Sequence, residues 1–271
     1  MQPRTADQSP PSTVCPTAID VRNFSFFYDA FQALDGINMN IRERRITALI
    51  GASGSGKSTL LRAINRMYDN TPGARSEGEI VFDGENILQA TNLVSLRKRI
   101  GMIFQRSTAF PMSIFDNIAY GLRLASQRCP ENQIKTRVEQ VLTDAGLWDE
   151  VKDKLDKSGL SLSGGQQQRM CIARAVAVDP SVLLMDEPCA ALDPISTNKV
   201  EQLMRALRER ITIVIVTHNM QQASRVADFT GFMDMNVETG AGQLVEVGET
   251  DQIFGHPRDQ RTAAYISGKF G

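Results

Sequence analysis

The sequence lacks long hydrophobic runs and lacks an excess of either charge. None of its apolar runs approaches the roughly 20 residues that a membrane-spanning helix needs, so we expect a soluble globular protein that something else would have to hold at a membrane. Lysine and arginine number 30 against 31 aspartates and glutamates, which leaves a formal net charge of -1. This balance argues against binding nucleic acid or an anionic membrane through net charge. The basic clusters at 42–45 and 97–99 are interpreted as solvated faces.

Cysteine and histidine are also scarce. Four cysteines are scattered over the chain without a CxxC pair, and only two histidines are present to help them bind a metal: the cysteines are Cys15, Cys129, Cys171 and Cys189. This pattern indicates a reducing, cytosolic setting. Residues 1–17 contain no apolar core of a signal peptide, and their proline, serine and threonine content predicts a disordered N-terminal tail.

Short segments with strand and helix patterns are present and predict an α/β fold. Alternating, β-branched segments predict strands over residues 18–28, 31–41, 79–84 and 100–105. Continuous apolar runs predict fully buried parallel strands over residues 46–51, 181–187 and 211–218. Helical patterns cover residues 131–147 and 200–210, the second after the start signal Asp193-Pro194.

The order of these elements predicts the architecture. Buried strands that alternate with helices indicate an α/β core, and the antiparallel strands gather at its N-terminal end. Residues of about 107–165 are helical with hardly any strand, so we interpret them as a helical insertion in that core. We expect one domain over residues 18–271.

The segment GASGSGKST at 51–59 fits the phosphate-loop pattern G-x-x-x-x-G-K-[ST] and lies between a strand and the helical pattern TLLRAINRM. Its glycines let successive N–H groups point at phosphate oxygens, the lysine supplies a positive charge for the β- and γ-phosphates, and the serine hydroxyl is a ligand for Mg²⁺. The alternative is a plain glycine-serine turn. The pattern predicts ATP and Mg²⁺ binding by Gly51, Ala52, Ser53, Gly54, Ser55, Gly56, Lys57, Ser58 and Thr59.

Two carboxylates follow the buried strand VLLM, at the strand end where α/β sheets place their ligands. Asp186 is a candidate ligand for Mg²⁺, and Glu187 is a candidate general base for the attacking water. The alternative is that the two residues form a surface turn without a catalytic role. His218 and Gln105 also end predicted strands, and each is either a site residue or a structural one. The segment LSGGQQQR at 162–169 is either a polar loop or a place where glycines bring the backbone close to a ligand.

These motifs occur together in an order and spacing that resemble the ATP-binding subunit of ABC transporters, from about residue 18 onward. The segment LSGGQ before an acidic strand is the diagnostic element, because kinases and GTPases with a phosphate loop lack it. The resemblance implies the ABC-type P-loop NTPase fold. It also implies that Tyr28 stacks on adenine, with Phe27 as the fallback, and that Asp29 stands where the family often has glycine.

The resemblance assigns further roles. Gln105 would reach Mg²⁺ and the attacking water, and His218 would contact the γ-phosphate. Two subunits would pack head to tail as a homodimer, so that each ATP also meets residues of the opposite subunit: Ser163, Gly164, Gly165, Gln166 and Asp193. The pair Cys189-Ala190 replaces the Thr-Ser that related sequences commonly show. We expect this change to modify the site without inactivating it.

The flanking segments resemble the phosphate-import branch of the family, chiefly VTHNMQQASRVAD at 216–228 and the C-terminal segment at 251–271. That branch implies uptake of inorganic phosphate, two integral membrane permease subunits, an extracytoplasmic phosphate-binding protein, and a place on the cytoplasmic face of the inner membrane. The alternatives are import of another small solute such as an amino acid, a soluble ABC-type ATPase of DNA repair or translation, and a regulatory module without turnover. We expect no nucleic-acid partner.

Overall fold

The computed structural model describes residues 16–106, 108–125 and 130–268, and its strands form one ten-stranded sheet. The strands are β1 (Thr17–Tyr28), β2 (Phe31–Arg42), β3 (Ile46–Gly51), β4 (Ala74–Phe82), β5 (Glu85–Asn86), β6 (Ile100–Ile103), β7 (Val182–Asp186), β8 (Thr212–Val216), β9 (Phe229–Met235) and β10 (Gly242–Glu249). Their order across the sheet is β5-β4-β1-β2-β10-β9-β3-β8-β7-β6. The predicted mixed α/β fold is confirmed.

The sheet has a parallel part and an antiparallel part, as the sequence pattern predicts. Strands β9, β3, β8, β7 and β6 are parallel neighbours, and every residue of β3, β7 and β8 is buried. Strands β1, β2, β4 and β5 pair antiparallel. Side chains on both faces of the parallel strands are covered, which explains their continuous apolar runs.

Several boundaries differ from those predicted. The strand expected at 79–84 begins earlier, at Ala74, and the one expected at 100–105 ends at Ile103. Of the tail predicted over 1–17, residues 1–15 lie outside the described residues, and Thr17 already belongs to β1. Cys15 and Cys129 also lie outside them. Strands β9 and β10 were not predicted, because short strands with glycine and charge carry a weak local pattern.

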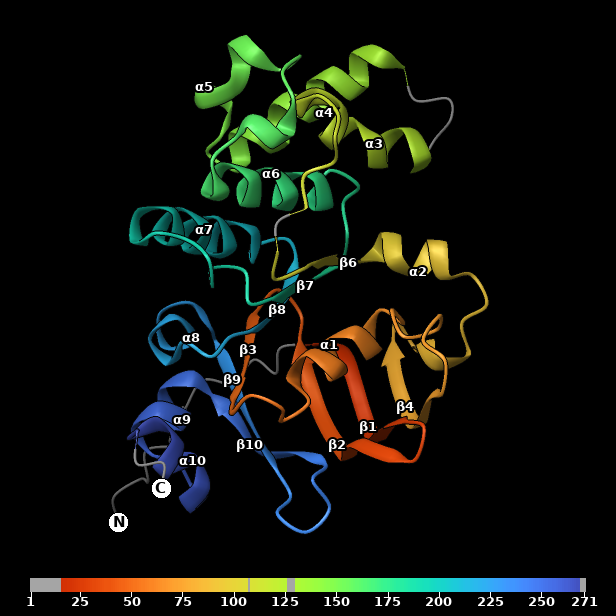
Figure 1. The fold of residues 1–271 in the computed structure, drawn as a ribbon, viewed down its shortest axis with the longest axis vertical. Helices are drawn as coiled ribbons and strands as arrows, with labels where there is room; N and C mark the ends of the chain where they lie inside the picture. Colours follow the sequence, from red (N-terminus) through yellow and green to blue (C-terminus); the bar gives the residue numbers. More distant parts are fainter. Residues whose placement is uncertain (1–15, 107, 126–129, 269–271) are drawn as a thin grey trace, which may run out of the picture.

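Helices cover the sheet and extend beyond it at one end (Figure 1). They are α1 (Lys57–Ile64), α2 (Leu93–Arg99), α3 (Ile114–Ala125), α4 (Glu131–Asp144), α5 (Trp148–Val151), α6 (Gly164–Val176), α7 (Pro194–Leu207), α8 (Met220–Val226), α9 (Thr250–Gly255) and α10 (Gln260–Ile266). The helix predicted over 131–147 ends at Asp144, because Gly146 takes a left-handed φ of 57° just after it. The helix predicted over 200–210 begins at Pro194 and ends at Leu207.

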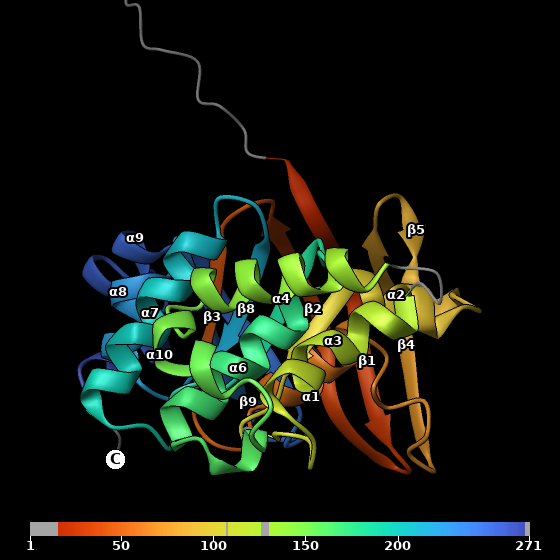
Figure 2. The same cartoon turned by 90° about the horizontal axis from the view of Figure 1, so that it is seen from above.

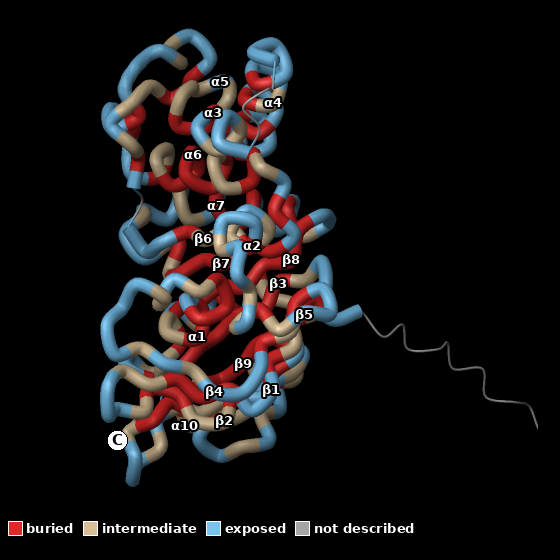
Figure 3. Tube along the Cα trace, turned by 90° about the vertical axis from the view of Figure 1, so that its right-hand side faces the viewer, coloured by how far each residue is buried: buried red, intermediate tan, exposed pale blue. Residues whose placement is uncertain are grey.

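The predicted insertion forms a separate helical layer. Figures 1 and 2 show α3, α4 and α5 stacked over α6, on the far side of α6 from the antiparallel strands. Within 107–165 the described residues contain no strand, only an isolated bridge between Ser113 and Ser158. Figure 3 shows buried backbone along β3, β7 and β8 and again along α6, which therefore joins the insertion to the sheet.

Asn117 fixes the start of the insertion. It is fully buried in α3, and its Oδ1 accepts from Phe110 N at 2.9 Å and from Arg174 Nη1 at 3.1 Å. Its Nδ2 donates to three backbone carbonyls, of which that of Ser113 is nearest at 2.9 Å.

In the described part of the chain, no helix has the length and apolar character that crossing a membrane requires.

We predict that Asn117→Ala lowers the free energy of unfolding by about 2–3 kcal/mol, because it removes the acceptor of the Phe110 N–H, one acceptor of Arg174 and a buried donor to three carbonyls. Urea denaturation measures this loss. Asn132→Ala, at an exposed position of α4, is the matched control and should stay within about 0.5 kcal/mol of the wild type. Equal stability of the two variants would contradict the role given to Asn117.

Candidate functional site

The phosphate loop connects β3 to α1 and leaves its backbone open. A Cβ on Gly51 would lie 2.0 Å from the carbonyl oxygen of Met233, and one on Gly56 would lie 2.4 Å from Leu34 Cδ2. No side chain fits at either place, so the loop needs glycine there. No side chain caps the N-terminus of α1. The N–H groups of its first turn therefore remain for an anionic ligand, as at other helix N-termini.

Lys57 lies inside this loop. It is 7% exposed, and its Nζ donates to Gly51 O at 2.8 Å, to Ala52 O at 2.7 Å and to Ser55 Oγ at 3.2 Å. Burial lowers the pKa of Lys57, while the charges of Glu187 and Asp186 act in the opposite direction. Among the described residues no carboxylate lies within ion-pair distance of Nζ. The loop therefore holds a buried ammonium group whose hydrogen-bond partners among the described residues are neutral, which suits a phosphate.

Asp186 joins the phosphate loop to β7. Its carboxylate is 3% exposed, and Oδ1 accepts from the Ser58 hydroxyl at 2.7 Å, while Arg62 Nη2 lies 3.4 Å from Oδ2. A serine hydroxyl and a carboxylate oxygen are ligands that Mg²⁺ prefers, and the oxygen of the Gln105 side chain belongs to the same class. These residues fit the predicted metal.

Glu187 is held between two side chains at the same sheet edge. Its Oε2 accepts from Gln105 Nε2 at 3.0 Å, and its Oε1 lies 3.1 Å from His218 Nδ1. The backbone of Glu187 has a positive φ of 47°, and its N–H donates to Val216 O at 2.9 Å. Strain of this kind at a side chain with a specific orientation is typical of functional sites. The predicted residues Gln105, Asp186, Glu187 and His218 thus come together.

The predicted adenine contact lies in the hairpin between β1 and β2. Tyr28 is half-buried, and its ring meets Phe26 edge-on with 5.0 Å between centroids. Phe27 is covered by the Arg75 guanidinium, 3.6 Å from its ring centroid, which leaves Tyr28 as the better stacking partner. Asp29 adopts φ of 50°, the conformation that glycine takes freely, and its N–H donates to Gly73 O at 2.9 Å. Asp29 therefore adopts the same turn conformation that a glycine would adopt at this position.

The LSGGQ segment, residues 162–166, lies apart from the phosphate loop of its own chain. Figures 1 and 3 show α6 well separated from α1. Ser163 caps α6 in a capping box: its Oγ accepts from Gln166 N, and its N–H donates to Gln166 Oε1 at 3.0 Å. A Cβ on Gly165 would lie 2.2 Å from Ser196 Oγ, whereas Gly164 has open space around it.

Asp193 begins α7 beside this segment. Its Oδ1 accepts from the N–H groups of Ile195 and Ser196, each at 3.0 Å. Hydrogen bonding, first of all from Ser196, lowers the pKa of Asp193. Ser196, which donates to Asp193, also lies against Gly165, so Asp193 and the LSGGQ segment are close to each other.

Residues 34–190 match the family described as ABC transporter, which is more than half of the chain. The chain belongs to the ABC transporter family. It is an ATPase domain of that family, whose members bind and hydrolyse ATP.

Two solved structures have the same fold. One is CbiO1 from Clostridium perfringens, part of the ABC transporter complex CbiONQ, with 28% identity and a TM-score of 0.76 over 93% of this chain and 96% of that one. The other is a bacterial Atm1-family ABC exporter with ATP bound, with 29% identity and a TM-score of 0.76. It matches 99% of this chain, which spans 44% of the exporter chain.

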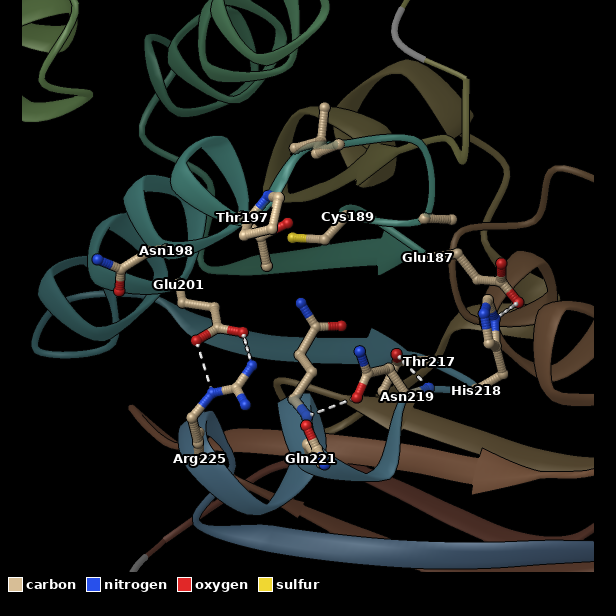
Figure 4. Close-up of a pocket in the computed structure, with 14 residues that line it drawn as sticks. Glu187, Cys189, Thr197, Asn198, Glu201, Thr217, His218, Asn219, Gln221 and Arg225 are labelled. Atoms are coloured by element: carbon tan, nitrogen blue, oxygen red, sulfur yellow. Dashed lines mark hydrogen bonds and ion pairs between the residues drawn. The ribbon is translucent and has the colours of Figure 1, made fainter.

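A cavity of about 530 Å³ opens beside Glu187 and His218 of the ATPase site (Figure 4). Helices α7 and α8 line it with an ion pair between Arg225 and the buried Glu201. Arg225 Nε and Nη2 lie 3.1 and 2.7 Å from the two oxygens of Glu201, which is 3% exposed. The sequence gives no signal for this pair, because its partners lie on two helices and belong to no motif.

Cys189 lines the same cavity of the ATPase. Burial raises the pKa of its thiol to about 11, so the group is neutral at physiological pH and fills space. Cys171, the other cysteine in the described part of the chain, is also a free thiol. The cysteine at position 189, where related sequences commonly have threonine, therefore adds no nucleophile to the site.

We predict that iodoacetamide labels Cys189 at pH 7.5 roughly two orders of magnitude more slowly than N-acetylcysteine, because the attacking thiolate is rare below a pKa of about 11. Mass spectrometry of the Cys189 peptide measures the rate. A raised thiol pKa also requires that labelling accelerates about tenfold per unit between pH 7 and 9. A rate that levels off near pH 8 would contradict the assignment.

Proposed function

We propose that this chain is the ATP-hydrolysing subunit of an importer of inorganic phosphate, bound to the cytoplasmic face of the cell inner membrane. The convergence of Glu187, Gln105 and His218 beside a phosphate loop supports the hydrolysis step. A regulatory module without turnover would have no use for a carboxylate held from both sides. We take residues 18–271 as a single nucleotide-binding domain with a helical subdomain at about 107–165.

The residues around Lys57 bind the nucleotide in this proposal. The N–H groups of residues 51–59 and the Lys57 ammonium hold the β- and γ-phosphates, for which Lys57 exchanges its bonds to Gly51 O and Ala52 O. Tyr28 stacks on the adenine. Ser58, Gln105 and Asp186 would hold Mg²⁺, which neutralises charge on the phosphates when bound.

Glu187 is the general base of the proposed reaction. Gln105 and His218 hold its two oxygens from either side, so the carboxylate stays where an attacking water would lie. Glu187 takes the proton of that water as the oxygen attacks the γ-phosphorus, and the bond from the γ-phosphorus to the β–γ bridging oxygen breaks, so that ADP leaves. His218, with 62% of its side chain exposed, is free to contact the γ-phosphate from the rim.

A second copy of the chain completes the site. Ser163, Gly164, Gly165, Gln166 and Asp193 would contact the ATP of the opposite subunit in a head-to-tail homodimer. The open space at Gly164 and the distance of α6 from its own α1 support this arrangement. ATP would then join the subunits, and its hydrolysis would let them separate.

The helical subdomain offers a surface for the proposed permease subunits. A cavity of about 480 Å³ is lined by Met112, Asp116, Tyr120, Arg123 and Leu124. Tyr120 and Leu124 are 44% and 69% exposed, unusual for apolar side chains on one helix. Two membrane permeases, and through them an extracytoplasmic phosphate-binding protein, are the proposed partners. CbiO1, as part of a transporter complex, supports such an assembly.

The choice of phosphate rests on the resemblance of the segments at 216–228 and 251–271. Import of another small solute, such as an amino acid, uses the same ATPase site and is the alternative. A soluble ABC-type ATPase of DNA repair or translation is less well supported, because the net charge of -1 favours no nucleic acid.

We predict that Glu187→Gln slows ATP hydrolysis by roughly 10²-fold or more while ATP affinity stays near the wild-type value, since the substitution removes the base and keeps the shape. Lys57→Ala should instead lose tight ATP binding. Phosphate release and fluorescent-nucleotide titration measure the two effects. Near-normal turnover in Glu187→Gln would rule out its role as the base.

We also predict that cells lacking this gene lose high-affinity uptake of labelled phosphate at micromolar supply. The wild-type gene should restore uptake and the Glu187→Gln gene should not. Uptake of labelled amino acids serves as the control and should be unchanged. Normal phosphate uptake in the deletion strain would refute the phosphate cargo and leave the ATPase assignment standing.

A further inference from the structure

One carboxylate in the helical subdomain joins three donors from two other helices. Glu150 of α5 accepts from Gln166 Nε2 at 2.8 Å and from Lys199 Nζ at 2.9 Å. Arg169 Nη2 lies 3.1 Å from both of its oxygens. Gln166 and Arg169 belong to α6 and Lys199 belongs to α7, so Glu150 connects α5, α6 and α7.

The charge on Glu150 is permanent, and Arg169 depends on it. Burial would raise the pKa of Glu150, but hydrogen bonds from Gln166 and Lys199 and the charge of Arg169 lower it to about 2. The Arg169 side chain is 3% exposed, and its remaining contact is to the carbonyl of Gly146. A guanidinium this deeply buried needs a counter-ion, and Glu150 supplies it.

Gln166 transmits the position of Glu150 to Ser163. The Gln166 amide has two ends: Nε2 donates to Glu150, and Oε1 accepts from the N–H of Ser163 at 3.0 Å. The bond to Glu150 therefore fixes which end of the amide faces Ser163. Without it the bond from the Ser163 N–H alone would hold this end of the amide, and the capping box of α6 would be less firmly fixed.

The same carboxylate sets the distance between α6 and α7. Lys199 crosses from α7 to Glu150, and Gly165 packs against Ser196 one turn earlier on α7. Ser196 N–H in turn donates to Asp193. The LSGGQ segment and Asp193 are thus tied together at two points, through Glu150 and through Gly165.

We propose that Glu150 is a positioning residue that holds the LSGGQ segment and Asp193 as one unit for the ATP of the opposite subunit. The proposal rests on the head-to-tail site of the proposed function. Glu150 itself touches no ATP and acts through Gln166 and Lys199. Loss of Glu150 should therefore impair hydrolysis of the ATP bound by the opposite subunit. ATP binding at the phosphate loop of its own subunit should be unchanged.

Subunit mixing tests this with the full-length chain. Glu150→Gln keeps one oxygen that accepts from Arg169, but it removes the counter-ion of Arg169 and cannot also serve Gln166 and Lys199. Alone it should hydrolyse ATP about tenfold more slowly than the wild type, the scale of a misplaced contact, with nucleotide affinity within about twofold. Asp149→Asn, which removes an exposed ion pair between α5 and Lys152 just after it, is the matched control and should keep full activity.

An equal mixture of Glu150→Gln with Glu187→Gln should be more active than the mean of the two variants measured apart. Half of the randomly paired dimers contain one site with an intact base and an intact LSGGQ segment. Given a tenfold defect, the mixture should exceed that mean about fivefold. Lys199→Met, an exposed change that leaves Arg169 paired, should show a smaller defect that mixing also rescues.

Two results would overturn the proposal: full activity of Glu150→Gln alone, or a mixture no better than the mean. The second would place the defect in the variant's own phosphate loop or fold, since neither is supplied by a partner. A wild type that hydrolyses no ATP would instead refute the proposed function, and this proposal with it.

Discussion

The parallel register of β3, β8, β7 and β6 is the constraint on which the site depends. Val216 of β8 pairs with Leu49 on one side and with Asp186 on the other, and Ile103 of β6 pairs with Met185. Because neighbouring parallel strands end at the same level, the groups that follow them meet at one edge. The phosphate loop, the acidic pair, Gln105 and His218 all follow such strand ends, although up to 167 positions separate them in the sequence.

This constraint explains what could be predicted. The buried strands were recognisable because a strand covered on both faces is apolar at every position, as in ITALIG of β3. The phosphate loop and acidic pair were recognisable because each is local in sequence. Strands β9 and β10 were missed, since β10 alternates only between partly exposed residues. The pairs Glu201–Arg225 and Glu150–Arg169 were missed because ion pairs between helices depend on how the helices pack, which no local pattern encodes.

The LSGGQ segment shows how one sequence serves two purposes. Ser163 and Gln166 satisfy the first turn of α6 by capping each other, and Gly165 is required by close contact with Ser196. A sequence that only needed to fold would therefore already choose these residues. Gly164 differs, because a Cβ there would meet nothing in the described structure. Its glycine has no explanation among the described residues, and the proposed contact with the ATP of a second subunit would provide one.

Helix α7 makes contacts both beside the LSGGQ segment and at the cavity next to Glu187. Lys199 and Glu201 lie two positions apart, which places their side chains on opposite sides of the helix. Lys199 reaches Glu150 beside the LSGGQ segment, and Glu201 pairs with Arg225 across the cavity next to Glu187. Glu201 is buried, whereas Lys199 and Glu150 are 45% and 30% exposed, so a shift of α7 would cost most at Glu201, whose charge would lose its counter-ion. The helix that begins at Asp193 is thus also the one that borders the cavity beside Glu187.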